Sequence, residues 1–268
     1  MLLTRVLTAL VLLPLMLAAL FLFPAEAWAG FSWLIIVLAL WEFSRMAGME
    51  GAGKWLYLAA SSALAAAAWF GHYRLGPVEH ALTLAFWLLL VPCWLAKRWR
   101  IRQGPMAWLL GWLLMLPAWF AFLEWRPQPG AADAFALLAV MGLVWVADIA
   151  AYFSGKAFGR RKLAPSISPG KSWEGVYGGV VCVALYVALV DHLGWIDTGL
   201  PVWALLLLAL PLTAVSVMGD LLESWFKRAA GVKDSSALLP GHGGVYDRID
   251  SLVAVLAVSN ALRVLGGM

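Results

Sequence analysis

Apolar residues fill this chain in nine blocks of about 17 to 22 residues, separated by short polar breaks. A helix needs about 20 predominantly apolar residues to cross the hydrocarbon core of a bilayer, whereas a transmembrane β-strand alternates over about 10 residues. The blocks do not alternate, so they predict an all-α polytopic membrane protein with about nine transmembrane helices. The predicted segments are residues 6–23, 28–44, 55–71, 78–96, 106–124, 133–154, 176–192, 201–218 and 249–265.

Composition agrees with this class of protein. Hydrophobic residues make up 63% of the chain and charged residues 13%, against roughly 25% charged residues in soluble domains. The first block is followed by Pro24-Ala-Glu-Ala27, which mimics the small-residue cleavage site of a signal peptide, but it is longer than the usual apolar region of about 7–15 residues. We therefore expect an uncleaved first helix. Cys93 and Cys182 lie inside apolar blocks and cannot form a disulfide framework.

The basic residues are distributed unevenly over the polar breaks. If the N-terminus is cytoplasmic and every block crosses once, 16 of the 19 basic residues lie on the cytoplasmic side. Only Arg74, Arg126 and Arg263 then lie outside. This asymmetry is typical of membrane proteins and predicts a cytoplasmic N-terminus and an extracytoplasmic C-terminus. The net charge of +4 is thereby explained by orientation, and we expect no nucleic-acid partner.

The polar sequence is concentrated in the second half of the chain. Residues 1–130 read as an N-terminal transmembrane helical region, and residues 131–268 as a transmembrane catalytic region with two long cytoplasmic loops, 155–175 and 219–248. The block before the first loop contains Asp148, and an ionisable group at membrane depth is costly and marks a functional site by default. Tyr152 and Gly155 follow at i+4 and i+7, on the same helical face.

The first loop contains the sequence Ser168-Pro-Gly-Lys-Ser172, preceded by three basic residues at 160–162. Glycine and proline predict a tight turn whose backbone amides face an anion, with Lys171 as a point charge. A Walker A motif is excluded, because its upstream glycine is missing and no strand is expected before it. Ser168 or Ser172 is equally suited to cap the next helix, with Glu174 in its first turn.

The second loop carries carboxylates at helical spacing. Asp220, Glu223 and Ser224 stand at i, i+3 and i+4 and share one helix face, while Asp247 and Asp250 are spaced i, i+3 where the last block begins. Magnesium takes hard oxygen ligands, usually one or two carboxylates together with substrate phosphates and water. Asp220 and Asp247 could supply them if the two helix ends adjoin; separate solvated carboxylates are the alternative.

Between these carboxylates, His242 stands among glycines that allow close approach of a ligand. The stretch 224–250 as a whole resembles the signature of phosphatidate cytidylyltransferases, also called CDP-diacylglycerol synthases. The matching positions are Ser224, Lys227-Arg228, Lys233-Asp234, Ser236, Pro240, His242-Gly-Gly244, Asp247-Arg248 and Asp250, together with Asp148, Tyr152, Ser168, Lys171, Ser172 and Glu174 further upstream. Ser236 stands where a glycine is common in that family. The resemblance covers about 145–250, and the first 130 residues match only as a helical membrane region.

The resemblance implies transfer of CMP from CTP to phosphatidic acid, with release of pyrophosphate, in a bacterial cytoplasmic (inner) membrane with the active site on the cytoplasmic side. It implies one or two Mg²⁺ ions at Asp220 and Asp247, with Asp148 or Asp250 near a second cation. Phosphate-holding and catalytic roles fall to Lys171, Lys227, Arg228, Lys233, Arg248 and the neighbouring His242. Substrate-binding roles fall to Tyr152, Ser168, Ser172, Glu174, Ser224, Asp234, Gly243 and Gly244. The partners are CTP, phosphatidic acid and the bilayer, and a homodimer is compatible with all of this.

Two other functions remain as alternatives. A CTP-dependent kinase acting on a polyprenol or similar lipid alcohol would need a base to activate a hydroxyl and would release CDP. A transporter would place charges deep in several helices and show repeated halves, whereas no internal repeat is visible here. A CDP-alcohol phosphotransferase is excluded, because its acidic helix pattern does not occur.

Overall fold

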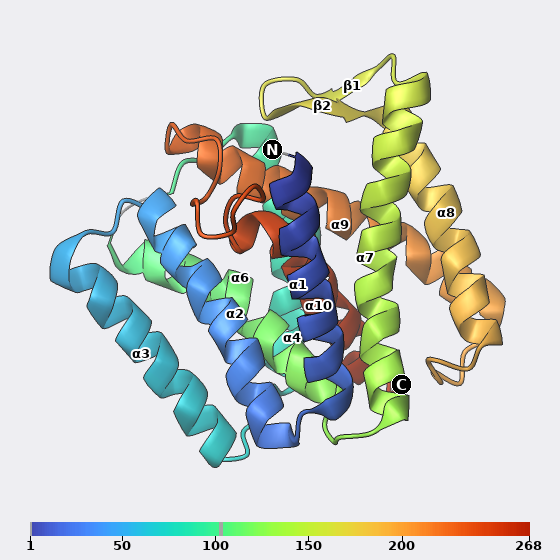
Figure 1. Ribbon diagram of the computed structural model, residues 1–268, viewed down its shortest axis with the longest axis horizontal. Coiled ribbons are helices and arrows are strands. Elements are labelled where there is room, and N and C mark those ends of the chain that lie inside the picture. The colour runs from blue at the N-terminus through green and yellow to red at the C-terminus, as the bar shows by residue number, and fades with distance from the viewer. Residues whose placement is uncertain (1, 102–103) are drawn as a thin grey trace.

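The computed structural model describes residues 2–101 and 104–268, and within them most of the chain is helical (Figure 1). Its helices are α1 (Leu2–Leu22), α2 (Ala25–Met46), α3 (Gly51–Phe70), α4 (Pro77–Ala85), η1 (Phe86–Leu90, a π-helix), α5 (Val91–Lys97), α6 (Pro105–Trp125), α7 (Ala131–Phe158), α8 (Trp173–His192), α9 (Val202–Ala229) and α10 (Tyr246–Leu265). Since α4, η1 and α5 follow one another without a break, each of the nine predicted blocks corresponds to one helical segment. The all-α prediction is confirmed.

Six helical segments among the described residues are long and apolar enough to cross a membrane. They are Ala25–Met46, Pro77–Lys97, Pro105–Trp125, Ala131–Phe158, Trp173–His192 and Val202–Ala229. This number supports an integral membrane protein. The nine crossings, the orientation of the termini and the boundary at residue 130 stay predictions.

Helix α10 is the central element of the bundle. It packs against α2, α4, α6, α7 and α9, and its residues 251–261 are all buried. Gly219 allows α9 to approach α10 closely, because a Cβ there would lie 2.6 Å from the carbonyl oxygen of Asp250 and 3.0 Å from the Cα of Ser251. The polar side chains in this stretch, Ser251, Ser259 and Asn260, are therefore surrounded by protein rather than by lipid.

The hydrophilic loop between α7 and α8 folds as an antiparallel hairpin of β1 (Lys162–Ala164) and β2 (Ser168–Ser172), seen at the top of Figure 1. The prediction of a tight turn at Ser168–Ser172 is wrong, because that segment pairs with β1 as a strand. The capping prediction is confirmed for Ser172, whose Oγ accepts a hydrogen bond from the Gly175 amide at 3.2 Å at the start of α8.

Both predicted loops are shorter than their sequence suggests. Helix α7 continues to Phe158 and α8 begins at Trp173, so the first loop is the hairpin with its connections. Helix α9 continues to Ala229, so residues 219–229 are helical and the second loop spans only 230–245. The helix persists because its apolar side chains Leu221, Leu222 and Phe226 are buried while its charged ones find partners within the protein.

Candidate active site

A cavity of about 540 Å³ opens at the end of the bundle that carries the β-hairpin. Its walls come from α7, β2, α8, α9 and α10. The predicted site residues that line it are Asp148, Tyr152, Ser168, Lys171, Ser172, Asp220, Lys227, Asp247, Arg248 and Asp250. The structure thus brings together groups that lie up to about a hundred positions apart in the chain, including all four carboxylates assigned to metal.

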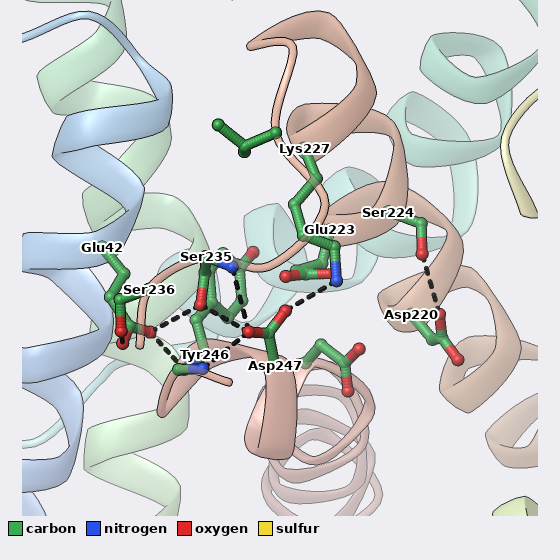
Figure 2. Close-up of polar contacts among 12 residues, drawn as sticks. Glu42, Asp220, Glu223, Ser224, Lys227, Ser235, Ser236, Tyr246 and Asp247 are labelled. Atoms are coloured by element: carbon green, nitrogen blue, oxygen red, sulfur yellow. Dashed lines mark hydrogen bonds and ion pairs between the residues drawn. The ribbon is translucent and has the colours of Figure 1, made fainter. Parts of the chain in front are cut away.

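Asp220 joins the hairpin to α9. The Nζ of Lys171 lies 2.6 Å from Asp220 Oδ2. Ser224 Oγ donates a hydrogen bond to Asp220 Oδ1 at 3.2 Å (Figure 2). Burial disfavours the charged form of Lys171, but the attraction of Asp220, supported by Asp148, outweighs burial and raises the pKa of Lys171. Lys171 is therefore a fixed positive charge in the cavity wall.

Asp247, the second residue of α10, is held by four contacts. Its Oδ1 lies 2.6 Å from the Nζ of Lys227, which also lies 2.7 Å from Oε2 of the fully buried Glu223. Its Oδ2 accepts hydrogen bonds from the Ser235 amide at 3.0 Å, the Ser235 hydroxyl at 2.9 Å and the Gly244 amide at 2.7 Å (Figure 2). Burial alone would raise the pKa of Asp247, but these donors lower it to about 2, so the carboxylate is ionised at neutral pH.

The two lysines bear on metal binding. Among residues 2–101 and 104–268, no group of three or more His, Cys, Asp or Glu side chains is close enough to hold one ion. Asp220 and Asp247 are instead each paired with a lysine. Their oxygens nevertheless face one cavity with Asp148 and Asp250, and one or two carboxylates suffice for Mg²⁺ when substrate phosphates complete its shell. The donor chemistry fits magnesium.

Several predicted residues lie beside the cavity rather than in its wall. Glu174 accepts hydrogen bonds from the amides of Arg160 and Arg161 at 3.1 and 3.2 Å and from Arg161 Nε at 3.1 Å, so it anchors the hairpin to α8. The others outside the cavity lining are Ser224, Arg228, Lys233, Asp234, His242, Gly243 and Gly244. Of these, Arg228, Lys233 and Asp234 are exposed to solvent.

Sequence reasoning overlooked Glu42. This residue of α2 is completely buried, and its carboxylate accepts four hydrogen bonds from the loop and helix that present Asp247 (Figure 2). The signal was present, since Glu42 is an acidic residue inside an apolar block, as Asp148 is. Its partners, however, lie about two hundred positions further along the chain.

Comparison with known proteins agrees with this geometry. The model of the cytidylyltransferase family matches residues 3–265. A phosphatidate cytidylyltransferase of Pseudomonas aeruginosa is 45% identical over 98% of this chain and 97% of its own length. One of Haemophilus influenzae is 38% identical over 96% of each chain. Because the match includes all the helices that line the cavity, the chain belongs to the cytidylyltransferase family.

Proposed function

We propose that this protein is an integral-membrane CTP:phosphatidate cytidylyltransferase, a nucleotidyltransferase of phospholipid biosynthesis. The observation that carries the proposal is that Asp220 pairs with Lys171, and Asp247 with Lys227, in the lining of one cavity. The similarity to a phosphatidate cytidylyltransferase, which extends over almost the whole length of both chains, supports it. Carboxylates for a metal and lysines for phosphates are what this reaction requires.

In the proposed reaction, a phosphate oxygen of phosphatidic acid attacks the α-phosphorus of CTP. A new phosphorus–oxygen bond forms, and the bond to the β-phosphate bridge breaks so that pyrophosphate leaves. A phosphate monoester loses its second proton at a pKa of about 6, so the nucleophile is largely ionised and needs no strong base. Catalysis then depends on alignment and on stabilising negative charge.

The cavity residues divide this work by chemistry. Lys171, Lys227 and Arg248 supply fixed positive charge for the phosphates. Asp220 and Asp247 would hold Mg²⁺, which when bound neutralises phosphate charge. Because both lysines now contact carboxylates at 2.6 Å, substrate phosphates would compete with Asp220 and Asp247 for them. The free cavity is thus kept near charge balance until an anionic substrate enters.

The location of the cavity suits one lipid and one water-soluble substrate. Its walls include the candidate membrane spans α7, α8 and α9, and it lies at the ends of these helices beside the hairpin. Tyr152 and Lys156, both exposed on α7, belong to its lining. We place this end at the cytoplasmic face of a bacterial inner membrane, where CTP is available. The proposal is also compatible with a homodimer.

Turnover by the purified protein tests the proposal directly. Protein in mixed micelles receives phosphatidic acid, Mg²⁺ and CTP labelled at the α-phosphate. We expect label in a CDP-lipid and one pyrophosphate per product. Release of CDP together with a phosphorylated lipid alcohol, when a polyprenol replaces phosphatidic acid, would identify the kinase alternative. Absence of both products from a folded protein would end the proposal.

A further inference from the structure

Glu42 is a buried carboxylate that does not line the cavity yet contacts the segment that presents Asp247. It accepts hydrogen bonds from the Ser235 hydroxyl at 3.0 Å, the Ser236 hydroxyl at 2.6 Å, the Val245 amide at 2.9 Å and the Tyr246 amide at 2.6 Å. Burying an ionised carboxylate is costly unless it is fully hydrogen-bonded. Four donors from a distant part of the chain meet that requirement.

Two of these donors are the backbone amides of Val245, which immediately precedes α10, and Tyr246, its first residue. A helix leaves its first four N–H groups without partners inside the helix, and a side-chain oxygen before the helix usually accepts one of them. Val245 precedes α10 and has no side chain that can do so. Glu42 accepts from Val245 and Tyr246 instead, and so caps α10 from another helix with a charge suited to a helix N-terminus.

A serine connects Glu42 to the cavity. Ser235 Oγ lies 3.0 Å from Glu42 Oε2 and 2.9 Å from Asp247 Oδ2, and its amide also donates to Asp247. A hydroxyl has one proton, so Ser235 holds the two carboxylates at a fixed separation while donating to one at a time. Gly244 completes the packing, because a Cβ at this position would overlap both Ser235 Oγ and Glu42 Oε1.

We propose that Glu42 is a positioning residue of the active site: acting through Ser235 and the first turn of α10, it fixes the orientation of Asp247 toward Lys227 and the substrate phosphates. The inference rests on the proposed function and assigns to α2, in the N-terminal half of the chain, a part in the chemistry. Because an error of about 1 Å in a reacting group can reduce a rate by about 100-fold, a residue that never touches substrate can still control turnover.

The test compares Glu42→Gln, Glu42→Asp and wild type. In Glu42→Gln, an NH2 group replaces one carboxylate oxygen and faces hydrogen-bond donors that this oxygen had accepted from. We therefore expect kcat to fall about 10- to 100-fold, as for other residues that orient a ligand. The KM for phosphatidic acid should change less than kcat, since Glu42 lies outside the cavity lining. Glu42→Asp keeps the charge and should recover part of the loss.

A second measurement needs no turnover. Hydrogen exchange at the amides of Val245 and Tyr246 should accelerate in Glu42→Gln while exchange in α7 stays at the wild-type rate. Should Glu42→Gln fail to fold, Ser235→Ala removes only the link between the carboxylates and should lower kcat in the same direction. Glu124→Gln changes another carboxylate that contacts α10, here a partly buried one; it is the matched control and should keep wild-type kcat.

The outcomes separate the two proposals. A folded Glu42→Gln protein with wild-type kcat and unchanged exchange at Val245 would overturn this inference while leaving the cytidylyltransferase proposal intact. Equal losses in Glu42→Gln and Glu124→Gln would reduce Glu42 to a stabilising residue. Failure of the wild-type protein itself to release pyrophosphate would instead remove the proposed function.

Discussion

Both ends of α10 are hydrogen-bonded to an acidic side chain from another helix, but only one of these side chains is connected to the charged cavity. At its start, Glu42 from α2 is buried against loop residues 235–236 and the backbone amides of Val245 and Tyr246. Near its other end, Glu124 from α6 accepts a hydrogen bond from Asn260 Nδ2 at 2.6 Å, and Arg263 donates to Asn260 Oδ1 at 3.0 Å. Each end therefore holds one acidic side chain supplied by a different helix.

The partners decide what each cluster can do. At the start of α10 the hydrogen bonds lead through Ser235 to Asp247 and a cavity of about 540 Å³ with charged walls. At the far end Arg263 lies over the ring of Trp125, 4.6 Å from its centroid, and the adjoining cavity of about 100 Å³ is lined mainly by apolar side chains. A buried carboxylate alone does not indicate function; access to a charged cavity distinguishes the two.

Removing the charge of Asp247 should have the largest effect on turnover. Asp247→Asn keeps the size of the side chain but loses the ion pair with Lys227 and the charge of the proposed metal ligand. We expect kcat to fall by about 10²- to 10³-fold, since removing one preorganised charge-stabilising group from an active site has an effect of about this size. Release of pyrophosphate measures it, with the unfolding midpoint as a control for folding; near-normal turnover would contradict the assignment.

Removing Lys171 should have the next largest effect. Lys171→Met preserves much of the packing but leaves Asp220 without its cation and the phosphates without one charge. We expect kcat/KM for CTP to fall about 10- to 100-fold, because several other cations share the cavity. Lys171→Arg keeps the charge and serves as the matched control. If both variants lose the same activity, the geometry of the ammonium group matters more than its charge.

Much of this site could be predicted from the sequence, because an unpaired charge inside the bilayer costs much free energy. Asp148 inside an apolar block and the i, i+3 pairing of Asp247 and Asp250 each require a shared polar environment, and the four predicted carboxylates do line one cavity. Helix positions followed from the same constraint, since a segment of about 20 apolar residues leaves few other structures.

The contacts between distant parts of the chain could not be predicted from the sequence. The extension of α9 to Ala229 depends on Glu223 and Lys227 neutralising each other inside the protein. The strand at 168–172 contains Ser, Pro and Gly, which have little preference for strands, and it exists only because β1 pairs with it. The hydrogen-bond donors to Glu42 in the described part of the chain lie 193 to 204 positions away, so its proposed role becomes visible only once α2 is known to contact α10.

Loosening the hairpin should have a smaller effect than removing Lys171. Glu174→Ala deletes the acceptor for two backbone amides and for the side chain of Arg161, which tie the hairpin to α8. Because Arg161 is largely exposed and water screens the pair, we expect little change in the free energy of unfolding. We expect the KM for CTP to rise about 2- to 5-fold as Lys171 becomes less well positioned. Glu174→Gln retains an acceptor and should show less of this change.

The smallest effect on turnover should come from the far end of α10, where a matched pair of variants sharpens the comparison. Ser235→Ala removes one donor from the buried carboxylate of Glu42, and Asn260→Ala removes one from the partly buried carboxylate of Glu124. Losing a donor to a buried charged group costs about 1–3 kcal/mol, so both variants should unfold at lower temperature. Only Ser235→Ala should also lose turnover when both are assayed well below that temperature, because only Ser235 reaches Asp247. If Asn260→Ala lost as much kcat as Ser235→Ala, activity would depend on the stability of α10 as a whole, and the contrast between its two ends would fail.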